Sequence, residues 1–251
     1  MELNLAGKKA VVTGATKGIG KAIVQTLAKE VVDVALCARN LDEVETTVAG
    51  LQQEGINAFG AVVDVQNKQA YEDWLNQAVT QLGGVDLFVP NVSAGGGMEG
   101  ESSWVKNFEV DVLGTVRGCE VLLPQINKGG AICFISSTAA VENFIAPQAY
   151  NALKAALINY AKHLSQAQAA NGIRVNTLSP GPVFIDDGAW DQIKSHMPDL
   201  YNSTLAQIPM GRMATAQEIA NSVVFLLSPA AGIITGTNLI ADGGFTKGVQ
   251  Y

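Results

Sequence analysis

The chain has 251 residues, of which 48% are hydrophobic and 16% charged, and its formal net charge is −7. Such an acidic balance argues against nucleic acid as the main partner, because phosphate backbones require a basic face. Charged residues interrupt the apolar runs, so no membrane-spanning segment is expected, and the first residues lack a basic stretch followed by an apolar signal core. We expect a cytoplasmic protein that binds neither nucleic acid nor membrane.

Cysteine and histidine usage argues against a structural metal or a disulfide framework. The three cysteines, Cys37, Cys119 and Cys133, are widely spaced, and the histidines are His163 and His196. Structural zinc sites need closely spaced ligand pairs, and disulfide frameworks need an even cysteine count. We therefore expect buried cysteines that behave as apolar residues, and no metal site.

Apolar, strand-like runs alternate with helical patterns along the whole chain. The expected strands are 9–13, 32–38, 58–63, 85–89, 131–135, 174–178 and 238–241. This alternation favours an α/β fold in which helices cover both faces of a doubly wound parallel sheet, in three α/β/α layers. Because folds of this size need no second domain, we expect one domain over residues 1–251.

A glycine-rich turn follows the first expected strand and opens a helix. Residues 13–20 read T-G-A-T-K-G-I-G, with Gly14 placed for a tight turn, Gly18 for close approach of a pyrophosphate and Gly20 for packing the helix on the sheet. Free amides at the helix N-terminus would face the phosphates. The spacing G-x-x-x-G-x-G differs from the common G-x-G-x-x-G, and alone it is only moderately specific, since glycines also punctuate ordinary turns.

Polar and small residues follow the expected strands, and the carboxyl ends of parallel strands line one crevice. The residues that these strands would bring to that crevice are Gly14, Arg39, Asp64, Asn91, Ser137 and Pro180. Core packing does not explain such convergence, so we expect a ligand site there.

Dinucleotide-binding folds of this kind distinguish NAD from NADP at the end of the second strand. Sites selective for NAD place an acidic residue there, whereas residues 37–40 read C-A-R-N. Lys17 and Arg39 would instead flank a 2′-phosphate through charge-assisted hydrogen bonds. The alternative is that both are solvated surface cations. We expect NADP(H).

Tyr150 and Lys154 lie four positions apart in a segment whose alanine and leucine content predicts a helix. On one helical face, the ammonium would stabilise the phenolate, and a positively charged oxidised nicotinamide would add to this effect. The alternative is a chance pair on an amphipathic helix. The glycine loop upstream favours the functional interpretation.

Together these motifs resemble the short-chain dehydrogenase/reductase family, in particular its 3-oxoacyl-reductase-like branch, over nearly the whole chain. The residues in the family's order are 13–20, Asp64, Val65, Asn91, Ser137, Tyr150, Lys154, Pro180, Gly181 and 242–244. The resemblance implies a Rossmann-like fold. It also implies that hydride passes between NADP(H) and a carbonyl or secondary alcohol, while Tyr150 exchanges the proton.

The resemblance assigns further roles. Ser137, rather than the neighbouring Ser136, would hold the reacting oxygen, and Lys154 would bind the nicotinamide ribose and assist Tyr150. Contacts to the cofactor are implied for Gly14, Thr16, Lys17, Gly18, Ile19, Gly20, Arg39, Asp64, Val65, Asn91, Tyr150, Lys154, Pro180, Gly181 and Val183.

The sequence offers an alternative role for Asp64 and only a degenerate motif around Asn91. Asp64 and Val65 would form the adenine pocket, although Asp64 is also placed to cap the helix expected near Asn67. Asn91 would support the sheet and the adenosine site, but its surrounding motif, P-N-V-S-A-G, is degenerate.

Two positions depart from the family's pattern. Asp111 stands where relatives carry an asparagine that supports a water chain to the lysine, and we expect it to keep the relay role while altering the pH profile of the reaction. Ile185 stands where many relatives have a threonine that contacts the carboxamide. Ile185 has no side-chain donor, so backbone groups of Val183 would have to bind that amide.

The segment 184–213 corresponds to the family's substrate lid and is rich in aromatic and apolar residues. It suggests an apolar or aromatic carbonyl substrate, although the same side chains could complete the core or a subunit interface. The C-terminal run 235–244 resembles the family's last strand, which commonly packs across a symmetry axis, and this implies a homotetramer.

Two classes of function follow. The first is an NADP-dependent reductase or alcohol dehydrogenase acting on a ketone or 3-oxoacyl substrate through Ser137, Tyr150 and Lys154. The second is a dinucleotide-binding sensor or scaffold that has lost turnover, suggested by Asp111 and Ile185. Fold analogy does not choose the substrate.

Overall fold

The computed structural model describes residues 1–96, 100–144 and 146–249. The strands of the main sheet are β1 (Lys9–Thr13), β2 (Asp33–Ala38), β3 (Ala58–Val62), β4 (Val85–Val89), β5 (Ile126–Ile135), β6 (Arg174–Pro180) and β9 (Asn238–Ala241), and β7 (Val183–Phe184) pairs with β8 (Ala214–Thr215). The α-helices are α1 (Gly18–Lys29), α2 (Leu41–Gln53), α3 (Lys68–Leu82), α4 (Glu101–Asn107), α5 (Gly114–Leu122), α6 (Ala149–Gln168), α7 (Ala189–His196), α8 (Pro198–Ala206) and α9 (Ala216–Leu227). A π-helical segment, Phe108–Leu113, joins α4 to α5.

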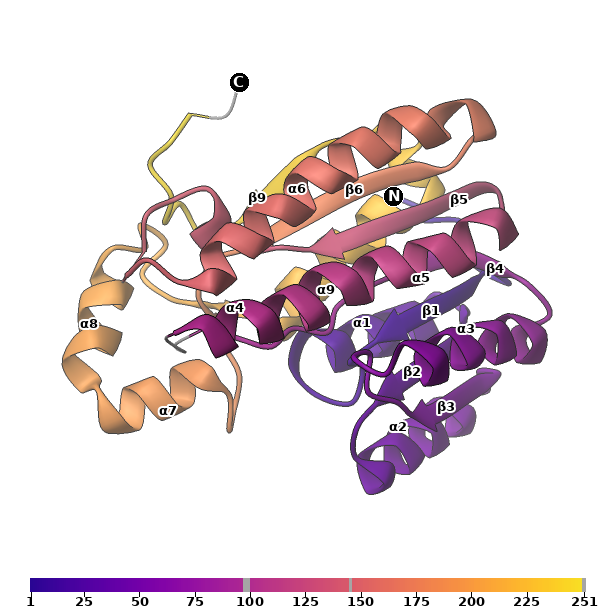
Figure 1. Ribbon diagram of the computed structural model, residues 1–251, viewed down its shortest axis with the longest axis horizontal. Helices are drawn as coiled ribbons and strands as arrows, with labels where there is room; N and C mark the ends of the chain where they lie inside the picture. The colour runs from indigo at the N-terminus through magenta and orange to yellow at the C-terminus, as the bar shows by residue number, and fades with distance from the viewer. Residues whose placement is uncertain (97–99, 145, 250–251) are drawn as a thin grey trace.

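The main sheet has seven parallel strands in the order β3-β2-β1-β4-β5-β6-β9 (Figure 1). The chain builds outward from β1 to β3 and then returns to place β4 on the other side of β1. Because the strand order reverses between β1 and β4, the connections at the carboxyl ends of these two strands diverge and leave a crevice. The topology therefore predicts a ligand site beside the glycine loop.

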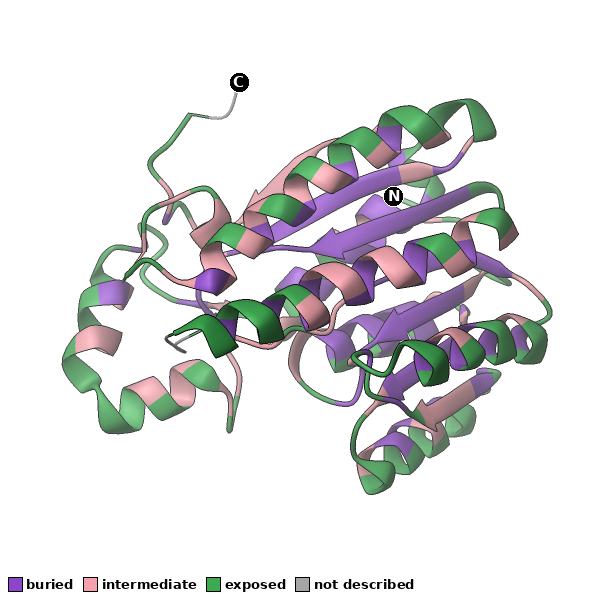
Figure 2. Ribbon diagram, viewed as in Figure 1, coloured by how far each residue is buried: buried purple, intermediate pink, exposed green. Residues whose placement is uncertain are grey.

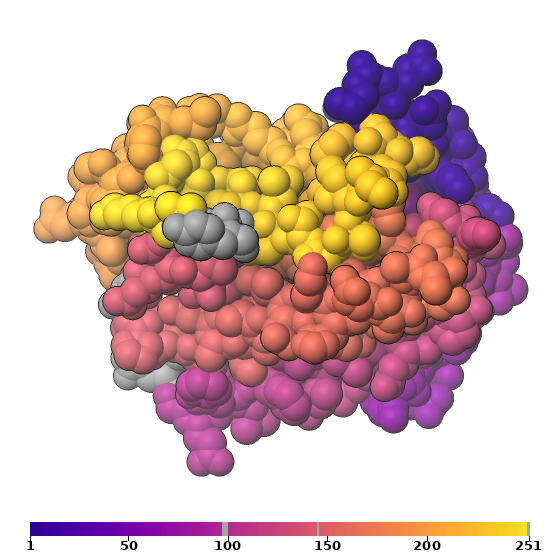
Figure 3. Space-filling view, turned by 90° about the horizontal axis from the view of Figure 1, so that it is seen from above, coloured from indigo at the N-terminus to yellow at the C-terminus, as the bar shows by residue number. Residues whose placement is uncertain are grey.

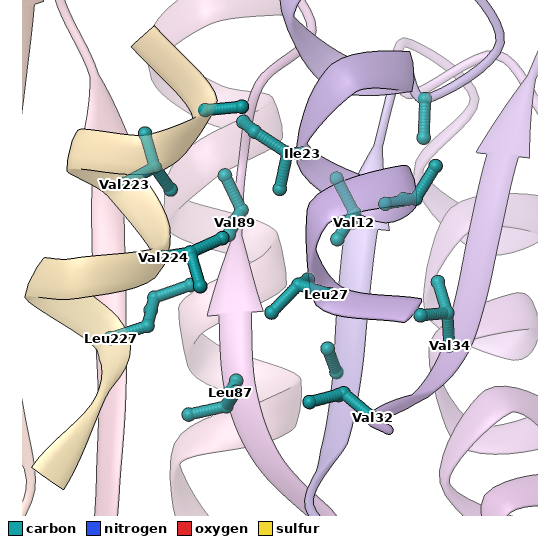
Figure 4. Close-up of a cluster of buried hydrophobic side chains, with 14 of the residues drawn as sticks. Val12, Ile23, Leu27, Val32, Val34, Leu87, Val89, Val223, Val224 and Leu227 are labelled. Atoms are coloured by element: carbon teal, nitrogen blue, oxygen red, sulfur yellow. The ribbon is translucent and has the colours of Figure 1, made fainter. Parts of the chain in front are cut away.

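Helices α1, α2 and α9 cover one face of the sheet. Apolar side chains recur at positions 23, 24, 27 and 28 of α1, which is the spacing of one helical face. Figure 4 shows Ile23 and Leu27 directed towards Val223 and Val224 of α9, above Val89 of β4. Burying each such side chain stabilises the fold by roughly 1.5–3 kcal/mol, so this contact holds α1, and the loop that precedes it, against the sheet.

Helices α3, α5 and α6 form the layer on the opposite face. Tyr71 and Trp74 of α3 stack with ring centroids 6.1 Å apart and are buried with Phe88 of β4. Gly118 lets α5 approach this cluster, since a Cβ there would lie 2.5 Å from the Phe88 ring. Figure 2 shows the result, with buried strands between two helical layers that are exposed on their outer faces.

The predicted fold class is confirmed, since a parallel sheet lies between two helical layers. Central strands buried on both faces appear in a sequence as continuous apolar runs, which is why their pattern is readable. Strand β5 begins at Ile126, earlier than predicted. The prediction missed its first part because Asn127–Gly129 is exposed and polar and gives no apolar run. Strand β6 likewise continues to Pro180.

Helices α7 and α8 project beyond the carboxyl ends of the strands and lie within the predicted lid segment (Figure 1). No residue of α7 is buried, and Figure 2 shows both helices largely exposed. Within the described part of the chain, no helix combines the length and the apolar character needed to span a bilayer.

Candidate active site

Two adjoining cavities lie at the carboxyl ends of the strands. One has a volume of about 430 Å³ and is lined by the ends of β1, β2 and β4 and by α2; the other, of about 260 Å³, is lined by the end of β5, the start of α6 and the segment after β6. Asn91 and Ser93 line both cavities. An elongated ligand can therefore occupy both, passing the N-terminus of α1 on its way.

The glycine loop is shaped by steric demands that the structure makes explicit. Gly14 and Gly18 have positive φ values of 64° and 52°, which non-glycine residues adopt at a cost. A Cβ on Gly20 would collide with the carbonyl oxygen of Gly14, and one on Gly18 would lie 3.1 Å from Ile185. The loop therefore leaves the N-terminus of α1, whose first amides have no intrahelical partner, beside the cavities.

Asn91 fastens the end of β4 to the glycine loop. Its side-chain amide donates to the carbonyl oxygens of Thr13, at 3.1 Å, and Gly14, at 3.0 Å. Its backbone N–H donates to the Thr13 hydroxyl at 3.0 Å. The degenerate motif around Asn91 therefore keeps a structural connection between the two strands that flank the crevice.

Asp64 and Val65 follow β3 and line the larger cavity. Helix α3 is capped by Asn67, whose side chain accepts from Ala70 N–H, so the alternative cap role for Asp64 is wrong. Asp64 instead accepts from Gln66 N–H within its own turn, at 3.0 Å. One carboxylate oxygen of Asp64 has no bond in the described part of the chain and lies beside the cavity.

The two predicted phosphate-selecting cations also line the larger cavity, together with a carboxylate. Lys17 forms a 2.7 Å ion pair with Glu43, and the Thr16 hydroxyl donates to the same carboxylate at 3.0 Å. The hydrogen bond from Lys17 holds the pKa of Glu43 below its usual range, so Glu43 is ionised at neutral pH. Arg39 is exposed and has no ion pair with any residue that the structure describes.

Ser136 and Ser137 both line the smaller cavity but differ in their partners. The Ser136 hydroxyl is buried and donates to the carbonyl oxygen of Lys154 at 2.9 Å. The Ser137 hydroxyl accepts from Ala139 N–H at 3.2 Å, which leaves its own proton to donate. Of the two, Ser137 is the one whose hydroxyl can reach a ligand as a donor.

Tyr150 and Lys154 lie one turn apart at the start of α6, and both line the smaller cavity with Ser137. The Lys154 ammonium lies 5.7 Å from the centroid of the Tyr150 ring. The same ammonium donates to the carbonyl oxygen of Ile135 at 2.9 Å. This bond fixes a side chain of which only 3% is exposed, so the charge is held beside the phenol.

Asp111 forms a direct ion pair with Lys154, with 2.9 Å between Oδ1 and Nζ, and only 1% of the aspartate side chain is exposed. Its other oxygen accepts from Ala94 N–H at 2.9 Å. The residue lies in the π-helical segment Phe108–Leu113, whose wider turn places the carboxylate towards α6. The carboxylate therefore contacts the lysine itself, where the sequence predicts a link through water.

Of the predicted lid residues, Trp190 is the aromatic side chain that lines the smaller cavity. Phe184 and Tyr201 pack with it, Ile208 and Met213 in a small separate core. Most of these aromatic side chains therefore complete a small core, and Trp190 also lines the smaller cavity.

The segment after β6 borders the smaller cavity. Pro180, Gly181 and Val183 line it, and Gly181 N–H donates to the carbonyl oxygen of Ala241 at 3.0 Å. Ile185 contacts Gly18 of the glycine loop, so its side chain packs against the loop. Ile185 does not line the smaller cavity and has no polar side-chain group to offer there.

Sequence reasoning missed Glu43 and Ser93. Glu43 follows the helix cap Asn40 by three positions, a spacing that marks helix starts and gives no sign of the contact with Lys17. Ser93, which lines both cavities, sits in the degenerate motif after Asn91. Neither position follows from the family's motifs.

The predicted burial of the cysteines is confirmed: Cys37, Cys119 and Cys133 are buried and free. Burial raises the pKa of Cys37 and of Cys133 to about 12, which leaves both thiols protonated and unreactive at neutral pH. Among the residues that the structure describes, no group of three or more histidines, cysteines or acids is placed to hold a metal ion.

Residues 14–246 match the model of a protein family described as Enoyl-(Acyl carrier protein) reductase. The chain is 34% identical to an isoepoxydon dehydrogenase, patN, of Aspergillus clavatus over 257 residues, covering 99% of this chain and 98% of the relative. It is also 34% identical to the 3-oxoacyl-[acyl-carrier-protein] reductase FabG of Vibrio cholerae, covering 96% of this chain and 98% of that protein. The similarity therefore extends over nearly the full length of both relatives.

Solved structures give the same result for the fold. L-sorbose reductase from Gluconobacter frateurii, solved with NADPH and L-sorbose, superposes with a TM-score of 0.90 at 29% identity and covers 99% of this chain and 100% of its own. A short-chain dehydrogenase from Burkholderia cenocepacia, solved with NADP, superposes with a TM-score of 0.87 at 27% identity, covering 96% of this chain and 98% of its own.

Proposed function

Because the chain belongs to the short-chain dehydrogenase/reductase family, we propose that it is an NADP-dependent oxidoreductase that interconverts a carbonyl compound and a secondary alcohol. The observation that carries the proposal is the shared cavity of Ser137, Tyr150 and Lys154, which adjoins the glycine loop. Relatives named as dehydrogenases and reductases over nearly their full length support the same reaction class.

The cavities fit a dinucleotide. Positive φ angles at Gly14 and Gly18, and the collision that a Cβ on Gly20 would have with the Gly14 carbonyl oxygen, describe a tight loop whose backbone a ligand can approach. In the proposed complex the N-terminal amides of α1 bind the pyrophosphate, Asp64 and Val65 hold the adenine, and the backbone near Val183 binds the carboxamide. When bound, the cofactor supplies or accepts a hydride at C4 of its nicotinamide.

The protein's part in the reaction is to orient the carbonyl and to move one proton. Ser137 donates a hydrogen bond to the carbonyl oxygen, and Tyr150 gives its phenolic proton to that oxygen as negative charge develops. Lys154 stabilises the resulting phenolate and binds the nicotinamide ribose. Asp111 contacts the ammonium from the side of the π-helical segment and offsets part of its charge.

The proposed preference for NADP rests on Lys17 and Arg39, which line the larger cavity, and on the residues directly after β2, Arg39 and Asn40, neither of which is acidic. The two structural relatives solved with NADPH or NADP support the same choice. Changing Arg39 to Asp tests it, because a carboxylate there repels a 2′-phosphate. We expect the ratio of kcat/KM for NADPH over NADH to fall at least tenfold, and an unchanged ratio would remove the role of Arg39.

The substrate class proposed is a ketone or a 3-oxoacyl compound with an apolar or aromatic part. Trp190 supports the aromatic preference, since its indole lines the cavity of the reacting groups. A homotetramer is proposed by family resemblance. Figure 3 shows residues from about 230 to 249, in yellow, lying beside the orange residues of α6 on one surface, where they are available for such packing. The cytoplasmic location stays a prediction.

The test of turnover is to mix the purified protein with NADPH and a panel of ketones, aldehydes and 3-oxoacyl thioesters and to follow the absorbance of the reduced nicotinamide. Changing Tyr150 to Phe should lower kcat by about 100- to 10,000-fold. The matched control is Tyr160→Phe on the same helix, which removes a hydroxyl near Cys119 and away from the cavity. Equal activity in all three proteins would refute the proposed acid.

The alternative function, a dinucleotide-binding sensor, is favoured by the buried Asp111 carboxylate, which offsets the charge of Lys154. A sensor binds NADPH and turns over nothing. Tight NADPH binding without turnover across the panel, together with a conformational response to the cofactor, would support it.

A further inference from the structure

A carboxylate occupies the part of the larger cavity where the proposed 2′-phosphate would bind. Glu43 lines that cavity together with Lys17 and Arg39. Its Oε1 lies 2.7 Å from Lys17 Nζ, and its Oε2 accepts the Thr16 hydroxyl at 3.0 Å. Both carboxylate oxygens are therefore used by groups of the glycine loop.

The two partners of this ion pair differ in freedom. Glu43 lies in the first turn of α2, where its backbone N–H bonds to the side chain of Asn40, and 29% of its own side chain is exposed. The Lys17 side chain is 77% exposed and carries four rotatable bonds, so it can move to another anion at low cost. Glu43 is therefore the more constrained partner of the pair, and Lys17 is the partner whose side chain is free to reorient.

We propose that Glu43 limits the preference for NADP over NAD, because its carboxylate competes with the cofactor's 2′-phosphate for Lys17. The inference rests on the proposed function, in which this cavity holds the adenosine end of NADP. Lys17, Arg39 and Glu43 all line this cavity, whose other charged lining residues are Lys106 and Asp64. A 2′-phosphate that binds Lys17 in this cavity must displace the Glu43 carboxylate from the ammonium. The phosphate and the carboxylate then lie close together and repel each other.

The size of the effect follows from charge. A 2′-phosphate carries between one and two negative charges, and a carboxylate at roughly 6 Å in water-like surroundings changes its binding by about tenfold before salt screening. NAD lacks the phosphate and has a free ribose hydroxyl in its place, so its binding depends little on this carboxylate. Glu43→Gln is therefore expected to tighten NADPH binding by about three- to tenfold and NADH binding by less than about twofold.

The experiment measures dissociation constants of NADPH and NADH by nicotinamide fluorescence at fixed ionic strength. Four proteins are compared with wild type: Glu43→Gln, Lys17→Met, the double variant, and Glu45→Gln. Glu45 is an exposed acid of the same helix that lies outside the cavity lining, so its variant controls for net charge. Thermal unfolding of each protein checks that the fold is kept.

The proposal predicts a higher NADPH-to-NADH affinity ratio for Glu43→Gln, no change for Glu45→Gln, and a smaller gain from Glu43→Gln when Lys17 is already Met. An unchanged ratio, or an equal gain without Lys17, contradicts it. Weaker NADPH binding by Glu43→Gln also contradicts it, since Glu43 would then be presenting Lys17 to the phosphate.

The failure of this inference differs from the failure of the proposed function. If wild type binds neither cofactor, the proposed function is wrong. If wild type binds NADPH and the NADPH-to-NADH affinity ratio is the same in Glu43→Gln, only the inference is wrong.

Discussion

The buried ion pair between Asp111 and Lys154 predicts a large and non-additive effect on stability. Changing Lys154 to Met leaves a carboxylate that is 1% exposed without its cation. Breaking a buried pair from one side costs about 3–5 kcal/mol, because the remaining charge is neither hydrated nor paired. For a chain of this length the melting temperature should fall by roughly 6–20 °C.

Changing Asp111 to Asn in the same protein should recover much of this loss. The double variant Lys154→Met/Asp111→Asn contains no stranded charge, and its amide oxygen can still accept from Ala94 N–H. What remains lost is chiefly the bond from Lys154 to the carbonyl oxygen of Ile135, worth about 1 kcal/mol. The double variant should therefore be at least about 2 kcal/mol more stable than Lys154→Met.

The assay is urea unfolding of the wild type, both single variants and the double variant without cofactor. Protein concentration is held constant, since any oligomer makes apparent stability depend on it. If the double variant loses the sum of the two single losses, the two side chains do not interact and the account of this pair is wrong.

Three further predictions follow. Asp111→Asn leaves the Lys154 ammonium without its carboxylate partner, so the rising limb of the pH profile for alcohol oxidation should move to lower pH, and an unchanged limb would argue against a role of Asp111 in the profile. Gly20→Ala should weaken NADPH binding at least tenfold by displacing the glycine loop, whereas Gly50→Ala, where a Cβ meets nothing within 4 Å, should leave binding unchanged; equal affinities would contradict the steric account. Glu218 forms a 2.6 Å ion pair with Arg212, and the hydrogen bond from Arg212 lowers the pKa of Glu218 from 4.5 to about 2. Glu218→Gln should therefore lower the melting temperature by about 2–4 °C at pH 7, and this difference should vanish as the pH falls from about 4.5 to about 2; a difference that stays constant with pH would exclude the linkage.

Much of the fold could be predicted from the sequence because its signals are local. The central strands are buried on both faces and appear as apolar runs, such as β4, Val85–Val89. The first part of β5 is not predicted because Asn127–Gly129 is exposed and falls where the register with β4 shifts, so no apolar pattern is required there.

The candidate site also has a part that the sequence predicts and a part that it does not. Motif residues such as Ser137 and Tyr150 are recognisable because chemistry requires those residue types at that spacing, and the structure places them at one cavity. Glu43 escaped notice because its contact with Lys17 crosses from α2 to the glycine loop and depends on three-dimensional packing. The direct contact of Asp111 with Lys154 likewise depends on a π-helical turn, which has no clear sequence signal.

The most direct test of the central claim follows the hydride itself. NADPH carrying deuterium at C4, prepared as each of its two epimers, is incubated with the protein and the carbonyl panel, and the alcohol products are analysed by mass spectrometry. The account predicts one deuterium at the former carbonyl carbon from one epimer, and loss of that product with Tyr150→Phe. Unlabelled products from both epimers, or no product despite tight NADPH binding, would contradict it.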